Sequence, residues 1–142
     1  MLKSKIIGIF LIVILFSGCE TAKEYSKGFL GISTKALEDN RKNAVVKDFD
    51  MDYDTCYKMA KEGLIARRTY IYAEDRKKGM IAVYASGDDT VAVGVFFQKI
   101  DNAKTRVEVS STSIYAKELV SGYVFAALRG EVYDKKAELP SE

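Results

Sequence analysis

Apolar residues between positions 53 and 64 repeat at the spacing of a helix. The repeat runs i, i+3, i+4, i+7 and i+11, which places its members on one helix face. Asp52 precedes it and is a favoured N-cap residue, so we expect a helix from Tyr53 to about Ala66. The apolar face consists of Tyr53, Cys56, Tyr57, Ala60 and Leu64.

A second helix is expected from Ile114 to about Arg129, capped by Ser113. Small residues on one side of it permit close packing, and we expect that side to be the buried one. It carries Tyr115, Leu119, Gly122 and Ala126.

Between and before these helices the pattern alternates with period two, which is typical of strands. The short turns "EDRKKG", "SGDD" and "DNAK" join successive segments and indicate antiparallel neighbours. The expected fold is therefore α+β, an antiparallel meander with helices packed on one face, in the order (β)-α-β-β-β-β-α. The expected strands are Val45–Phe49, Thr69–Ala73, Met80–Ala85, Thr90–Ile100 and Thr105–Ser111.

The alternation also assigns residues to the two faces of the sheet. The helix-covered face would carry Ile71, Ile81, Val83, Val91, Val93, Val95, Phe97, Val107 and Val109. The opposite face would carry Tyr70, Tyr72, Tyr84, Phe96, Arg106 and Glu108. This second face is either a solvated sheet face or a contact surface for a partner or a second copy. We take Tyr70, Tyr72, Tyr84 and Arg106 as the candidate partner face, since Tyr and Arg are enriched at interfaces.

Residues 20 to 44 are polar, with glycines at positions 28 and 31. We expect a loose tether and then a short helix from Thr34 to Asn43, with Ser33 as N-cap. Either this N-terminal helix partly covers the tyrosines, with Phe29 and Ile32 as contacts, or a partner covers them. We expect the first arrangement.

The N-terminus resembles a bacterial lipoprotein signal. Lys3 and Lys5 precede an apolar run that is too short for the roughly 20 residues of a membrane span. The run ends in Phe16-Ser17-Gly18-Cys19, which is similar to a lipobox. An ordinary secretion signal with a chance cysteine is the alternative. We expect Cys19 to be lipidated, carrying diacylglycerol and palmitate chains that hold the protein on a membrane.

Removal of residues 1–18 also removes two lysines, so 20 basic and 20 acidic residues remain. A neutral chain without a basic cluster gives no reason to expect nucleic-acid binding. The expected organisation is a signal peptide (1–18), a lipidated tether with a short helix (19–44), an α+β domain (45–130) and a charged C-terminal tail (131–142).

Candidate catalytic and metal-binding residues are scarce. The sequence contains no histidine, and Cys56 lies on the apolar helix face, where core packing is its expected role. "DFDMDYD" resembles the start of a calcium loop, but neither register supplies the required Gly and Glu. We expect no metal, no cofactor and no enzymatic activity.

The lipobox, the tether, "FDMDYDTCYKMAKEGL", "EDRKKGMIAVYAS" and "TRVEVSSTS" together resemble a family of small bacterial lipoproteins of unknown function. The resemblance covers roughly Val45 to Leu128. It implies an α+β domain anchored in the cell envelope, in which a strand and a helix precede an antiparallel sheet and a last helix. It implies no catalytic residues.

The expected function is that of a non-catalytic, lipid-anchored envelope protein that either binds another macromolecule, such as a protein or a second copy of itself, or supports envelope assembly. Glu20 is not an inner-membrane retention residue, which favours the outer membrane in a Gram-negative organism. The alternative is a periplasmic carrier of a small apolar ligand, with a pocket between the sheet and the helices.

Overall fold

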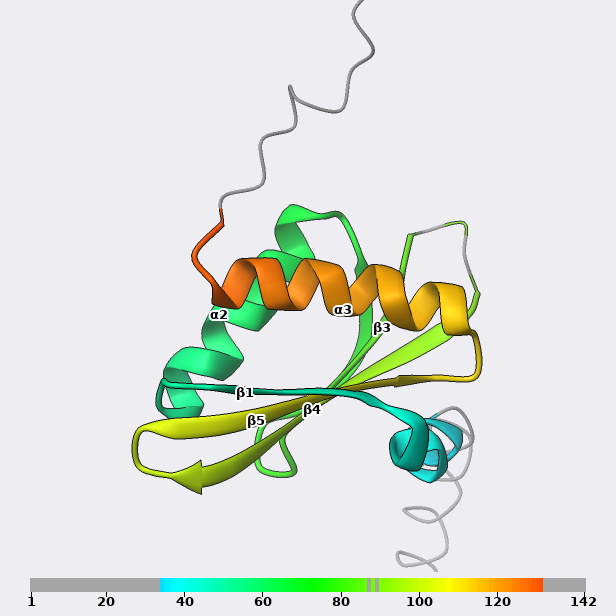
Figure 1. The fold of residues 1–142 in the computed structure, drawn as a ribbon. Coiled ribbons are helices and arrows are strands. Elements are labelled where there is room, and N and C mark those ends of the chain that lie inside the picture. Colours follow the sequence, from blue (N-terminus) through cyan, green and yellow to red (C-terminus); the bar gives the residue numbers. More distant parts are fainter. Residues whose placement is uncertain (1–33, 87, 89, 132–142) are drawn as a thin grey trace, which may run out of the picture. The chain divides into compact units, whose positions relative to one another are not determined.

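The computed structural model describes residues 34–86, 88 and 90–131, which fold as one compact unit (Figure 1). The expected signal peptide, the expected lipidation site Cys19, the expected tether up to residue 33 and the expected tail beyond residue 131 lie outside the described residues.

The fold is α+β, as the sequence predicts. Five antiparallel strands form one sheet in the order β1-β5-β4-β3-β2. The strands are β1 (Val45–Phe49), β2 (Tyr70–Asp75), β3 (Met80–Tyr84), β4 (Ala92–Asp101) and β5 (Lys104–Ser111). The helices are η1 (Asn40–Asn43), α2 (Tyr53–Ala66) and α3 (Ile114–Leu128), and residues 34–39 form a further helical segment that continues into η1.

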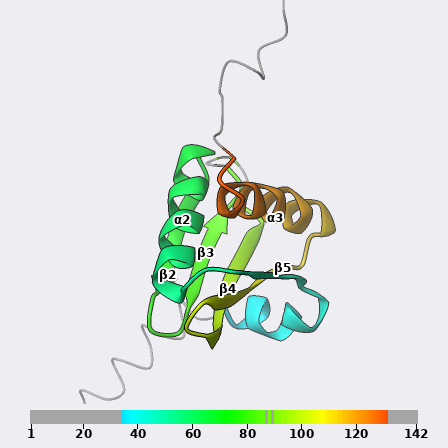
Figure 2. The same cartoon turned by 60° about the vertical axis from the view of Figure 1, so that its left-hand side comes forward.

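Helices α2 and α3 lie on one face of the sheet, while the helix formed by residues 34–43 lies on the other (Figures 1 and 2). The face under α2 and α3 holds the main core. Seven of the nine residues that the alternation assigns to this face are buried in the core, and Ile71 and Val91 pack against it partly buried. The face assignment is therefore confirmed.

Both predicted N-caps of the long helices are confirmed. The Asp52 carboxylate accepts a hydrogen bond of 3.0 Å from the Thr55 amide, and the Ser113 hydroxyl accepts one of 3.2 Å from the Ala116 amide. These bonds satisfy amides that have no partner inside the helix. The predicted start of each helix is correct for this reason.

The predicted packing side of α3 is wrong. Tyr115 is 74% exposed and Gly122 faces open space, and of the predicted residues only Ala126 is among the buried ones, whereas the other buried residues follow a different stripe. That stripe includes Ala116, Val120, Val124 and Leu128. Apolar residues occur all round α3, so the periodicity does not select a side. The sheet and α2 select it instead, because they offer the surface against which α3 packs.

The two helices pack closely at Gly63 of α2, where a Cβ atom would overlap the Cβ of Ala127 of α3. Gly63, rather than the predicted Gly122, therefore permits the close packing of helices. Among the described residues, no helix combines the length and the apolar character that crossing a membrane requires.

Candidate interaction surface

The far face is the sheet face opposite α2 and α3. Strand pairing sets the residues of this face opposite one another on neighbouring strands. Tyr70 is opposite Tyr84, and Phe96 is opposite Glu108. The six residues that the alternation assigns to this face include these four. The far face therefore combines aromatic and charged side chains, as expected.

The N-terminal helix covers part of the far face, as predicted. Leu37 is only 1% exposed and forms a small second core with Met80, Ala82 and Phe96. Gly94 leaves the room for this contact, since a Cβ atom there would lie 3.1 Å from the Cβ of Leu37. The expected contacts of Phe29 and Ile32 lie outside the described residues.

Polar contacts hold the same helix in place. The hydroxyl of Ser110 donates to the carbonyl oxygen of Leu37 at 2.6 Å. The Arg41 guanidinium donates to Glu108 at 2.7 Å and lies 4.5 Å above the centre of the Phe96 ring. These contacts join the helix to β4 and β5, so the cover lies over that side of the sheet.

The three predicted tyrosines form a stack on β2 and β3, which we call the tyrosine cluster (Tyr70, Tyr72 and Tyr84). The ring centre of Tyr84 lies 4.4 Å from that of Tyr72 and 6.2 Å from that of Tyr70, with nearly parallel planes. Tyr72 packs against the second core, whereas Tyr70 is 58% exposed on the edge strand. The cluster thus runs from the covered part of the far face to its open end.

A β-bulge lies at Tyr72, within the stack. The pairing register shifts between Ile71 and Ala73, so Tyr72 is the extra residue on the β2 side. Residues two apart on a regular strand already share a face. The shift changes the position of Tyr72 along β2, and its ring lies closer to Tyr84 than the ring of Tyr70 does.

Arg106, the fourth predicted member of the partner face, does not join the tyrosine cluster. It lies on β5, and β4 separates β5 from β3. Its guanidinium binds both carboxylate oxygens of Asp48 on β1, at 2.8 and 3.1 Å. This bidentate hydrogen bond holds the pKa of Asp48 below its usual value. Arg106 therefore acts as a link between two strands.

Sequence reasoning missed Leu37 and Arg41, the two residues that dock the N-terminal helix. Leu37 lies within the predicted helix from Thr34 to Asn43 and is its bulkiest apolar residue. That bulk was the signal that could have identified it. The partners of Arg41 come from β4 and β5, more than 50 residues away, and carried no local signal.

Cys56 is buried in the main core with no exposed surface, which confirms the predicted packing. Burial in this apolar environment raises the pKa of the thiol to about 12. A thiol with so high a pKa remains protonated at neutral pH and is a poor nucleophile. The geometry therefore gives Cys56 a structural role.

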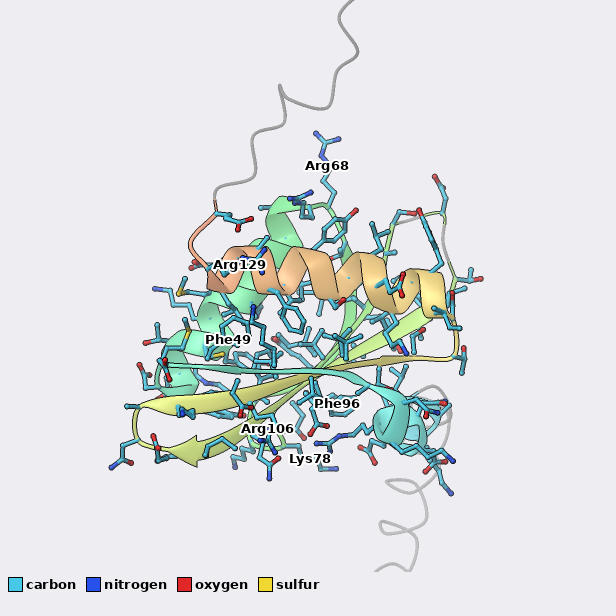
Figure 3. The ribbon with its side chains drawn as sticks, viewed as in Figure 1. Phe49, Arg68, Lys78, Phe96, Arg106 and Arg129 are labelled. Atoms are coloured by element: carbon cyan, nitrogen blue, oxygen red, sulfur yellow. The ribbon has the colours of Figure 1, made fainter. Side chains whose placement is uncertain are left out.

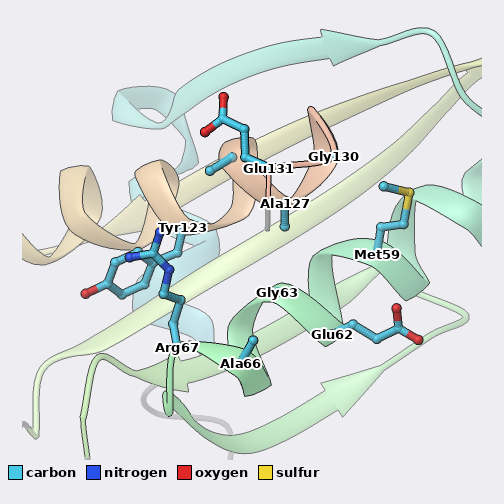
Figure 4. A pocket seen from close by; sticks show the side chains of 10 residues that line it. Met59, Glu62, Gly63, Ala66, Arg67, Tyr123, Ala127, Gly130 and Glu131 are labelled. Atoms are coloured by element: carbon cyan, nitrogen blue, oxygen red, sulfur yellow. The ribbon is translucent and has the colours of Figure 1, made fainter. Parts of the chain in front are cut away.

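A pocket of about 340 Å³ lies between the C-terminal ends of α2 and α3 (Figure 4). Gly63 and Ala127 form part of its wall, and the Arg67 guanidinium lies 4.7 Å from the ring centre of Tyr123 at one side. This pocket lies between the helices. The space between sheet and helices, where a carrier was expected to hold its ligand, contains the fully buried side chains of Leu64, Val83, Val95 and Val120.

The scan of protein-family models and the search of curated proteins found no match for this chain. The resemblance to small bacterial lipoproteins therefore stays a prediction from the sequence. The tyrosine cluster and the helix that borders it are the features from which a function can be argued.

Proposed function

We propose that this protein is a non-catalytic, lipid-anchored protein of the bacterial cell envelope that binds a partner protein through the tyrosine cluster. Cys19 is the anchoring residue, and residues 20–33 connect it to the folded domain. In a Gram-negative organism the outer membrane is the proposed location.

The exposure of Tyr70 is the observation that carries the binding part of this proposal. Its ring stacks on Tyr84, so part of the aromatic surface is already ordered before any partner arrives. Ordering a side chain at an interface costs about 0.5–1.5 kcal/mol, and a stacked ring has lost much of that freedom beforehand. Tyrosine is also among the residues that contribute most to binding energy at interfaces.

The N-terminal sequence supports the anchoring part. The charged start, the short apolar run and the small residues before Cys19 have the order of a lipoprotein signal. The test is detergent phase partitioning of the protein and its Cys19→Ala variant. We expect the unchanged protein to enter the detergent phase and to have a mass increased by the lipid. The Cys19→Ala variant should lack this increase in mass. An equal mass for the two proteins contradicts lipidation.

The binding part is tested by site-specific photo-crosslinking in living cells. A photoreactive residue replaces Tyr70 in one strain and Tyr115 in another, since both tyrosines are exposed but only Tyr70 belongs to the tyrosine cluster. We expect a discrete crosslinked protein band at position 70 that is absent at position 115. The same bands at both positions, or none at position 70, contradict binding through the tyrosine cluster.

A further inference from the structure

A cleft of about 620 Å³ lies between the first half of α2 and the end of β2, away from the far face. Small-molecule sites usually have volumes of about 300–1,000 Å³, so the cleft has the size of a ligand site. Tyr57 belongs to its wall and is itself buried, whereas charged side chains surround it. The residues that line it come from α2, β2 and the turn after β2.

Both carboxylates of this cleft already have cationic partners. Lys61 binds one oxygen of Glu74 at 2.9 Å, and the Tyr57 hydroxyl donates to the other at 3.2 Å. The hydrogen bond from Lys61 is the main reason that the pKa of Glu74 is lowered. Arg76 binds Asp54 at 2.8 Å. The negative charges that line the cleft are therefore compensated.

A positive charge remains. Lys58 forms no ion pair within the described part of the chain, whereas the Thr55 side chain already has the Asp52 carboxylate as its hydrogen-bond partner. Arg76 uses one of its terminal nitrogens for Asp54 and keeps its other N–H donors. Three cations and two carboxylates line the cleft, so an anion that enters it meets a net charge of +1 and several unused donors.

We propose that this cleft binds the phosphate or carboxylate group of a small soluble molecule. Lys58 is the first donor to the anion, and Arg76 adds a planar set of N–H groups that matches its oxygens. The two ion pairs link α2 to the end of β2 and hold Lys61 and Arg76 in place. The site is separate from the tyrosine cluster, and it does not depend on lipidation.

The test is a titration of the full-length protein in zwitterionic micelles, followed by NMR of the backbone amides. Glycerol 3-phosphate supplies the phosphate group, succinate supplies carboxylates, and glycerol is the neutral control. We expect saturable shifts at Thr55 and Lys58 with at least one anion, at a Kd of about 1 mM or tighter. Absence of these shifts with both anions, or equal shifts with glycerol, overturns the proposal.

A pair of charge variants tests whether the cleft itself binds the anion. Lys58→Gln and Lys99→Gln remove the same charge, but Lys99 is exposed on β4 and does not line the cleft. We expect Lys58→Gln to weaken binding about fivefold, the effect of losing one solvent-exposed ion pair, and Lys99→Gln to change it little. Equal weakening by both variants identifies non-specific attraction and overturns the site.

A vesicle experiment distinguishes a soluble ligand from a lipid headgroup. Phosphatidylglycerol vesicles present a phosphate at a surface and are added in place of glycerol 3-phosphate. We expect glycerol 3-phosphate to shift the backbone amide signals of Thr55 and Lys58 as strongly as the vesicles do. Shifts with vesicles alone overturn the assignment to a small soluble molecule.

Discussion

The hydroxyl of Ser110 donates a hydrogen bond of 2.6 Å to the carbonyl oxygen of Leu37, 73 residues earlier in the chain. Both residues are buried, so this bond satisfies polar groups that solvent does not reach. It joins the N-terminal helix to β5 on the far face.

Replacement of Leu37 by Ala should destabilise the protein. The change removes the bulkiest apolar side chain of the N-terminal helix and leaves a cavity beside Phe96, which typically costs about 2–4 kcal/mol. In a domain of this size, each kcal/mol lowers the melting temperature by about 4–8 °C. Thermal unfolding measures the effect, and Lys35→Ala on the exposed side of the same helix is the control. Equal melting temperatures of the two variants would contradict docking of the helix.

Two glycines in the long helices should respond oppositely to replacement by Ala. At Gly63 the new Cβ overlaps the Cβ of Ala127, so the helices must separate, which costs about 1–3 kcal/mol. At Gly122 nothing lies within 4 Å, and the higher helix propensity of Ala gains about 1 kcal/mol. Chemical denaturation of both variants checks the signs. Stabilisation by Gly63→Ala would show that α2 and α3 are not packed as described.

Arg68 should be replaceable by Gly with a gain in stability. Its φ of 59° lies in the left-handed region, where it ends α2, and its side chain points away from the domain (Figure 3). A left-handed conformation costs a non-glycine residue about 1 kcal/mol, which Gly avoids. We expect the melting temperature to rise by several degrees in Arg68→Gly. Arg67→Gly is the contrasting variant, because Arg67 has a negative φ and its guanidinium lies above the Tyr123 ring; it should lower the melting temperature.

The stability of the protein should fall above pH 9 because of Cys56. Below that pH the thiol is protonated in the folded and the unfolded chain alike. Between the ordinary thiol pKa of 9.0 and the folded pKa of about 12, only the unfolded chain loses the proton, so the free energy of unfolding decreases. Denaturant titrations at pH 8 and pH 9.5 measure this decrease, and Cys56→Ala should reduce it. The same decrease in Cys56→Ala would assign it to other groups.

Thiol labelling gives a second measure of Cys56. A small thiol reagent at pH 8 should react with the folded protein slowly and with the denatured protein at once, because the sulfur has no exposed surface. The rate should rise in variants that unfold more often, such as Leu37→Ala. Immediate labelling of the folded protein would contradict the buried position and return Cys56 to the candidate reactive residues.

The sequence by itself determined the elements and the two faces of the sheet. The bounds of β1 and α2 are as predicted, because an N-cap and a regular apolar repeat are local properties. The face of each strand was also predictable, since neighbouring side chains alternate sides. The alternation predicted that aromatic residues lie on the far face, but the residues that dock the N-terminal helix there, Leu37 and Arg41, were found only in the tertiary structure.

Tertiary structure alone decided the packing side of α3, the bulge at Tyr72 and the partners of the charged residues. The apolar surface of α3 extends round the helix, so only its neighbours select Ala116 and Val120 over Tyr115. The pairing of Arg106 with Asp48, and the cleft between α2 and β2, depend on residues brought together from distant segments. The hydrophobic pattern of the sequence does not reveal such contacts, because a charged residue at a surface position looks the same in the sequence whichever distant residue it contacts.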